Sequence, residues 1–324
     1  MAKKIILPIL VLAIALSLGF FVWWSQSLGA VSPTSNVSKD FLITKGSSAT
    51  QIATKLQKEG LIKNALIFRV YVIVSGSAKK IQAGEYSLSP SFTIQRIVSE
   101  FLSGPREVWV TVPEGLRREE VAERFVVGLG IAEEEKSAFR KEFLSLTKGK
   151  EGYLFPDTYL FPKEASASVV TRKMLTTFTQ KAGQVDMETL ILASLLERET
   201  ITVGEKPVVA GIILKRARAG WPLQIDAAVQ YAVATTKCGN TTVCSDWWPI
   251  LTREDIEIKS AFNTYRNPGF PPAPIASPGL ASINAAKAPE DSSYWYYIHD
   301  TKGQIHYATT LEEHNANVRQ YLGK

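Results

Sequence analysis

A predicted helix near the middle of the chain constrains the fold more than any other segment. From Leu190 to Leu196 the sequence is apolar apart from Ser194, so nearly every face of this helix is apolar. Asp186 is a favourable N-cap residue, and the β-branched residues after Thr200 predict that the helix ends there. A helix that is apolar all round is stable only when other elements cover it. We therefore expect this helix to be the buried centre of a domain.

Two glutamates follow this apolar run, and they are the first candidates for catalytic chemistry. Glu197 and Glu199 are two residues apart, so they lie on different faces and do not form a paired dyad. The carbonyl-rich end of a helix and apolar surroundings both disfavour a carboxylate anion and raise its pKa. Such a carboxyl group suits general acid catalysis near neutral pH, and Glu199 lies closer to the helix end. The alternative is a solvated helix end at which both glutamates pair with Arg198, Lys206 or Arg253.

The N-terminus predicts a membrane anchor. Residues 5–24 contain no charged side chain, and about 20 apolar residues suffice to cross the hydrocarbon core of a bilayer. Trp23 and Trp24 stand at the far end, where indole rings favour the membrane interface. We expect a cytoplasmic stub at 1–4, a single transmembrane helix at 5–24 in the plasma membrane, and a linker at 25–40 that leads to an extracytoplasmic chain. The alternative is a cleaved signal peptide, whose apolar region is usually shorter, about 7–15 residues.

The next part of the chain repeats one local pattern three times. Residues 41–62, 84–104 and 108–131 each contain a short strand pattern, a break rich in Gly, Ser or Pro, and an amphipathic helix pattern. This repetition predicts a small α+β module at 41–128. The module resembles LysM domains, which bind polymers of N-acetylglucosamine. A generic α+β packing unit without a ligand fits the same pattern.

The remaining residues, 129–324, predict a second domain of mixed α+β character. Aromatic residues and prolines are concentrated in EGYLFPDTYLFP, too many for a plain surface loop. A long stretch rich in Asn, Pro and Gly, FNTYRNPGFPPAPIASPGL, is typical of a functional loop. Helix patterns cover about 167–182, 186–200 and 206–219, and the last third has two strand patterns, YWYYIHD and GQIHYATT, and a helix pattern, LEEHNANVRQYL.

Other classes of chemistry lack their sequence signatures. The three histidines, His299, His306 and His314, do not have zinc-ligand spacing, and no GxSxG, P-loop or GxGxxG motif occurs. We therefore expect no metal and no cofactor. The net charge of +6 is modest. The sequence has no Lys/Arg stripe with interleaved aromatic residues, the pattern typical of nucleic-acid binding.

The two cysteines, Cys238 and Cys244, lie close together in the sequence, with no further Cys or nearby His to complete a metal site. A local disulfide agrees with an oxidising exterior, and a reduced thiol pair is the alternative.

Five stretches in the second half of the chain carry a resemblance to a known family. They are EGYLFPDTY, LASLLERET, LQIDAAVQYA, FNTYRNPGFPPAPIASPGLASINAA and HNANVRQYL. In order and spacing they resemble the endolytic murein transglycosylase family, also called YceG-like, and the N-terminal anchor and LysM-like region match as well. The resemblance implies a YceG-like catalytic domain at 129–324 and assigns the role of essential acid to Glu199. One departure is the segment with Cys238 and Cys244, where the family has a plainer loop.

The reaction that this resemblance implies is cleavage of the MurNAc–GlcNAc β-1,4 bond of nascent peptidoglycan strands without water. The products end in 1,6-anhydroMurNAc, and strand elongation is terminated. The partners implied are glycan strands and peptidoglycan synthases. A catalytically silent LysM-type scaffold of the cell-wall synthesis machinery is the alternative function.

Matched residues with polar side chains are candidates for substrate binding. Gln224 and Asp226, with Asn263, Thr264 and Tyr265, offer amide, carboxylate, hydroxyl and phenol groups suited to sugar hydroxyl and acetamido groups. For Asp226 the alternative is that its side chain caps the helix that follows.

Overall fold

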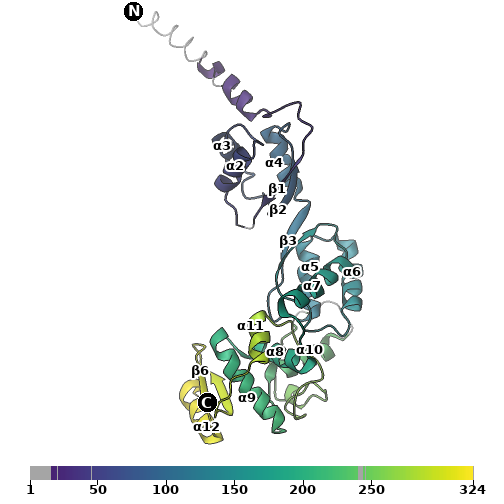
Figure 1. The fold of residues 1–324 in the computed structure, drawn as a ribbon, viewed down its shortest axis with the longest axis vertical. Coiled ribbons are helices and arrows are strands. Elements are labelled where there is room, and N and C mark those ends of the chain that lie inside the picture. The colour runs from purple at the N-terminus through teal and green to yellow at the C-terminus, as the bar shows by residue number, and fades with distance from the viewer. Residues whose placement is uncertain (1–15, 20, 45, 240–243, 245, 324) are drawn as a thin grey trace, which may run out of the picture. The chain divides into compact units, whose positions relative to one another are not determined.

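A computed structural model describes residues 16–19, 21–44, 46–239, 244 and 246–323 (Figure 1). Within these ranges, no helix is both long enough and apolar enough to cross a membrane. The predicted transmembrane helix at 5–24 falls largely on residues 1–15 and 20, which lie outside the described part.

The chain divides into two compact units. Unit 1 comprises Met1–Trp109 and Leu160–Lys163, and unit 2 comprises Val110–Tyr159 and Glu164–Lys324. The division falls at 109/110, earlier than the expected domain boundary at 128/129. The third strand-turn-helix segment is therefore shared, because its strand begins in unit 1 and its helix belongs to unit 2.

Unit 1 has the mixed α+β character expected from its sequence. Its strands and helices are β1 (Lys39–Ile43), α2 (Ala49–Lys58), α3 (Ala65–Val74), β2 (Gly84–Leu88), α4 (Ile94–Ser103) and the start of β3 (Glu107–Thr111). β1 and β2 pair antiparallel, with Phe41 opposite Tyr86. Phe101 of α4 packs against both rings, at centroid distances of 6.1 and 4.8 Å, so the apolar stripe of α4 closes the core.

Unit 2 is mainly helical. It contains α5 (Arg118–Gly128), α6 (Glu133–Leu146), α7 (Ala167–Ala182), α8 (Met187–Glu199), α9 (Lys206–Arg218), α10 (Asp226–Cys238), α11 (Leu280–Lys287), β5 (Tyr296–His299), β6 (Ile305–Ala308) and α12 (Leu311–Leu322). β5 and β6 form an antiparallel hairpin against which α12 packs. One strand was not expected from the sequence, namely β4 (Thr158–Pro162) within the aromatic and proline-rich segment, which begins in unit 2 and ends in unit 1.

Helix α8 is the centre of unit 2, as its apolar sequence predicts. Every residue from Leu190 to Leu196 is buried, and α8 contacts α9, α10 and α11 (Figure 1). The Asp186 side chain accepts a hydrogen bond from the Thr189 amide, which confirms the predicted N-cap. Buried Ser194 is satisfied because its Oγ donates to the Ile191 carbonyl and accepts from the Ile275 amide. The helix therefore has little freedom to move, and its last residue, Glu199, is held in a fixed place.

Candidate active site

Glu199 is the last residue of α8, and its carboxyl group is hydrogen-bonded to a tyrosine. The Tyr297 hydroxyl, on strand β5, donates to Glu199 Oε2 at 2.9 Å. Burial raises the pKa of Glu199 to about 7, the Tyr297 hydrogen bond lowers it, and the nearby charge of Asp226 raises it. A carboxyl group that titrates near neutral pH can both give and accept a proton under physiological conditions. Tyr297 was not predicted as a site residue, because Glu199 lies 98 residues away from it in the sequence.

A second carboxylate and a second phenol lie beside this pair. The Tyr265 hydroxyl donates to Asp226 Oδ1 at 2.6 Å. Burial first, and then the hydrogen bond to Asp226, raise the pKa of Tyr265, so it remains a neutral donor. Burial and the charge of Glu199 likewise raise the pKa of Tyr297. Asp226 is exposed, whereas Glu199 is partly buried, so the two carboxyl groups have different environments. Of the two, Glu199 is the better candidate for the general acid.

The predicted capping role of Asp226 does not appear. Asp226 is the first residue of α10, and the N-cap position belongs to Ile225, which makes no side-chain cap. The negative charge of Asp226 still favours the N-terminal turn of α10 through the helix dipole. Its Oδ1 oxygen binds Tyr265 instead of a backbone amide of α10.

Two of the predicted substrate-binding residues are buried, and their side chains form hydrogen bonds with backbone groups. Asn263 is fully buried, and its Nδ2 donates to the carbonyls of Ile256 and Ile258 at 2.7 and 2.9 Å. Thr264 is also buried, and its Oγ1 accepts from the Ile225 amide at 2.9 Å. These two side chains therefore hold the backbone of the loop and are not accessible at its surface.

Gln224 is exposed and occupies an unusual backbone conformation. Its φ of 56° lies in the left-handed region, which non-glycine residues rarely adopt. The Gln224 amide donates to the Thr264 carbonyl at 3.1 Å, which holds the turn. Backbone strain of this kind is common at binding sites, and the Gln224 side chain is placed at the surface two residues from Asp226.

Glu197 has structural partners that Glu199 lacks. Its Oε2 accepts from the Gly279 amide and from Ser282 Oγ, both at 2.8 Å. Its Oε1 lies 3.4 Å from Lys206 Nζ, and both side chains are less than a tenth exposed. The predicted pairing with Lys206 is thus present, but it is buried and not at a solvated helix end.

Lys206 connects the Glu197 contacts to the end of α8. Its Nζ also donates to Thr200 Oγ1 at 3.1 Å and to Ser282 Oγ at 2.8 Å. Thr200 is the C-cap residue next to Glu199, so the ion pair fixes the backbone that carries the acid.

Glu114 is a third carboxylate near this network. It lies directly against Gly279, where a Cβ atom would overlap the Glu114 carboxylate in its present position. Burial and the charge of Glu197 raise the pKa of Glu114, and Lys206 lowers it. Glu114 was not predicted from the sequence, although it follows Pro113 in the break of the third strand-turn-helix segment.

A separate buried cluster joins α5 to α10. Arg117 is almost fully buried, and its guanidinium lies 4.0 Å from the centre of the Tyr231 ring and 4.5 Å from that of Trp247. Its Nη2 donates to Thr235 Oγ1 at 2.9 Å. Glu151 accepts from the Arg118 amide at 3.0 Å, and burial raises the pKa of Glu151 to about 8. The cluster fixes α10, whose first residue is Asp226.

Cys238, at the end of α10, is joined to Cys244 by a disulfide, with Cα atoms 5.8 Å apart. Residues 240–243 and 245 between and beside them lie outside the described part.

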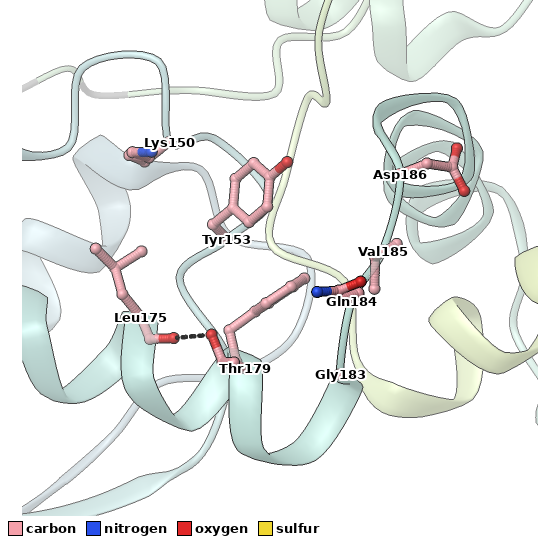
Figure 2. A pocket seen from close by; sticks show the side chains of 9 residues that line it. Lys150, Tyr153, Leu175, Thr179, Gly183, Gln184, Val185 and Asp186 are labelled. Atoms are coloured by element: carbon pink, nitrogen blue, oxygen red, sulfur yellow. Dashed lines mark hydrogen bonds between the residues drawn. The ribbon is translucent and has the colours of Figure 1, made fainter.

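An open pocket of about 560 Å³ lies at the other end of α8 (Figure 2). It is lined by Tyr153, Phe178 and Asp186 among others, and the rings of Tyr153 and Phe178 are 5.1 Å apart. Asp186 and Glu199 are at opposite ends of α8, about 20 Å apart along the axis. The pocket is therefore distinct from the surroundings of Glu199. Among the described residues, no three His, Cys, Asp or Glu side chains are grouped so that they could hold a metal ion.

Comparison with known proteins gives consistent matches over nearly the whole chain. The sequence profile of the YceG-like family matches residues 41–320. An endolytic murein transglycosylase of Bacillus subtilis is 29% identical over 343 residues, which cover 94% of this chain and 90% of that protein. An endolytic murein transglycosylase of Streptococcus pneumoniae is 27% identical over 99% of this chain, and the chain spans 65% of the length of that relative.

A solved structure gives the same result for the fold. The crystal structure of a YceG-like protein from Listeria monocytogenes matches 87% of this chain and 99% of its own, with a TM-score of 0.52 and 27% sequence identity.

Proposed function

The chain belongs to the YceG-like family, and we propose that it is an endolytic murein transglycosylase, a lyase that cleaves peptidoglycan strands. Relatives that match over nearly all of the chain carry this name. The observation that supports it best is Glu199, a carboxyl group whose pKa is raised to about 7 at the end of a rigid buried helix. A lytic transglycosylase needs one group that acts first as an acid and then as a base, and such a pKa suits both roles.

The first step is protonation of the leaving oxygen. Protonated Glu199 gives its proton to the glycosidic oxygen between MurNAc and GlcNAc, and the C1–O bond breaks with its electron pair on that oxygen. The cationic centre at C1 of MurNAc is stabilised by the N-acetyl group of the same sugar. Two-carboxylate glycosidases use a second acid at this point. Here the substrate supplies the stabilising group, so one carboxyl group is enough.

The second step closes the product ring. The Glu199 carboxylate takes the proton from the C6 hydroxyl of MurNAc, and the C6 oxygen bonds to C1. This gives the 1,6-anhydroMurNAc end and returns Glu199 to its protonated form. No water is consumed, because the attacking hydroxyl group belongs to the substrate itself.

The neighbouring side chains hold Glu199 ready for both steps. Tyr297 fixes Glu199 Oε2 through its hydrogen bond, so Glu199 Oε1 is the oxygen that donates and accepts the proton. We assign Gln224, Asp226 and Tyr265 to contacts with the sugar hydroxyl and acetamido groups, since all three border Glu199 or the turn next to it. Asn263 and Thr264 position that turn and do not contact the substrate.

The other parts of the chain fit a membrane-bound enzyme of cell-wall synthesis. We propose that residues 5–24 anchor the protein in the plasma membrane, with the catalytic part extracytoplasmic and peptidoglycan synthases as partners. In unit 1 the order β1–α2–α3–β2 is the strand-helix-helix-strand order of a LysM-like module. We assign glycan binding to this module.

The experiment that tests the proposal is digestion of peptidoglycan by the purified chain, followed by mass analysis of the muropeptides. The wild type should produce anhydro ends, and Glu199→Gln should produce none. Glu188→Gln is the matched control, because Glu188 is an exposed glutamate at the other end of the same helix. Anhydro ends made by Glu199→Gln at the wild-type rate would show that another residue moves the protons.

A further inference from the structure

Trp221 is an exposed aromatic residue that the proton chemistry does not use. It is the most exposed tryptophan of unit 2, with 39% of its surface accessible. Its ring packs against Trp295, with centroids 4.7 Å apart and planes inclined by 32°, and lies 6.2 Å from the Tyr296 ring. An indole that stays exposed forgoes the free energy of burial, so an exposed aromatic pair near an active site is a natural surface for a ligand.

Cations lie over the other tryptophan rings of unit 2. The Arg117 guanidinium is 4.5 Å from the Trp247 ring centre, and the Arg198 guanidinium is 3.9 Å from that of Trp248. Lys215 Nζ is 4.5 Å from the Trp295 ring centre. In the described part of the chain no such cation lies over Trp221. Trp295 therefore acts as a support, and Trp221 presents the accessible ring.

One arginine connects this aromatic pair to the acid. Arg216 Nε donates to the Trp295 carbonyl at 2.7 Å, and its Nη1 donates to the Leu223 carbonyl at 3.3 Å. Arg216 is also close enough to Glu199 for its positive charge to lower the pKa of that carboxyl. Two residues after Trp295, on strand β5, the Tyr297 hydroxyl donates to Glu199. The backbone segments that carry both tryptophans are thus fixed next to Glu199.

The segment that follows Trp221 is rigid. Pro222 pairs with Pro268 in an isolated bridge, and the Gly269 amide donates to the Trp221 carbonyl at 3.4 Å. The turn at Gln224 is held by Thr264, as described above. Five residues lead from Trp221 to Asp226, a reach of at most about 17 Å in an extended chain. That distance suits a sugar ring close to the cleaved bond, not one far along the strand.

We infer that Trp221, supported by Trp295, forms a stacking surface for a pyranose ring of the glycan strand next to the scissile bond. The inference rests on the proposed function. A β-linked pyranose exposes a face of C–H groups that packs flat on an indole ring, while its hydroxyl groups point to the side. The exposed Gln224 amide lies three residues away, where it can bind such groups. An endolytic enzyme holds sugars on both sides of the bond it cleaves, and Trp221 supplies one of these positions.

The test measures binding and catalysis separately. In the catalytically inactive Glu199→Gln chain, a further Trp221→Ala change should weaken binding of uncross-linked glycan strands about 5- to 20-fold, measured by calorimetry. Trp221→Phe should restore most of this affinity. With Glu199 intact, Trp221→Ala should raise KM by a similar factor and leave kcat nearly unchanged, because the ring binds the strand and does not touch the reacting atoms.

Tyr294→Ala is the matched control. Tyr294 is exposed at 36% and stacks on Tyr307 at 4.9 Å, so it is an aromatic residue of the same region outside the Trp221 pair. Its loss should leave strand binding unchanged.

Three results would overturn the inference. They are unchanged strand binding by Trp221→Ala, an equal loss of binding in Tyr294→Ala, and a fall in kcat with KM constant. The proposed function fails in a different way, through the absence of anhydro ends from the wild-type chain. A wild type that makes anhydro ends while Trp221→Ala has the wild-type KM refutes only the stacking surface.

Discussion

The substitution of glutamate by glutamine at the end of α8 should have opposite effects on stability at two positions that are two residues apart. Glu199 is partly buried and has a tyrosine, not a cation, as its hydrogen-bond partner, whereas Glu197 forms a buried ion pair with Lys206. Glu199→Gln should therefore stabilise the protein at alkaline pH, and Glu197→Gln should destabilise it.

The size of the first effect follows from the pKa of Glu199. Burial raises it from an ordinary 4.5 to about 7. Between these values the folded protein holds a proton that the unfolded chain has lost, so wild-type stability falls as the pH rises through this window. Above about pH 7 the cost is at most about 3 kcal/mol. Glutamine does not titrate, so Glu199→Gln should be more stable than the wild type by about 1–3 kcal/mol at about pH 8 and equal to it near pH 4.

The second effect has the opposite sign. Glu197→Gln leaves the charge of Lys206 buried without an ionised partner, which costs about 3–5 kcal/mol. The amide oxygen of glutamine still accepts from Gly279 and Ser282, which places the loss toward the lower end of that range.

Native-state hydrogen exchange of the α8 amides measures both effects, because it reports the free energy of opening this helix in a chain with two units. The expected result is slower exchange for Glu199→Gln than for the wild type at about pH 8, a difference that disappears near pH 4, and faster exchange for Glu197→Gln. Equal destabilisation by both substitutions at about pH 8 would refute the assignment of Glu199 as the carboxyl group with the raised pKa that transfers the proton.

Three further predictions concern Tyr297, Asn263 and the Cys238–Cys244 disulfide. Tyr297→Phe removes a donor to the ionised carboxyl, so the pKa should rise and the alkaline limb of the pH–rate profile should move up by about one to two pH units; a downward shift would contradict this. Asn263→Ala leaves two partly buried carbonyls without donors and should lower the free energy of unfolding by about 1–3 kcal/mol, measured by denaturant titration. Reduction of the Cys238–Cys244 disulfide should cost roughly 2 kcal/mol and leave kcat/KM unchanged, and a loss of activity without a loss of stability would place this loop in the site.

Local patterns in the sequence predicted helices α7, α8, α9 and α12 of unit 2 closely. The N-cap at Asp186 and the end of α8 at Glu199 follow from short-range rules that the structure obeys. The hairpin of β5 and β6 and the final helix α12 were predicted for the same reason. Strand β4 was not predicted, because its aromatic and proline content hides the alternation that buries Tyr159 and Phe161.

Long-range partners set the limit of prediction in the site. The sequence alone could not distinguish Glu197 from Glu199, because Gly279, Ser282 and Tyr297 decide their environments from far along the chain. The polar side chains of the loop after residue 262 could not be assigned from the sequence either. Their chemistry suits a sugar, yet two of them satisfy buried backbone groups, and only the folded loop reveals which.

The most direct test of the central claim is digestion of peptidoglycan in water labelled with heavy oxygen. If Glu199 transfers the C6 hydroxyl proton and no water attacks, the MurNAc ends are lighter than reducing ends by one water and contain no heavy oxygen. Reducing ends that carry the heavy oxygen at C1 would identify a hydrolase and contradict the account.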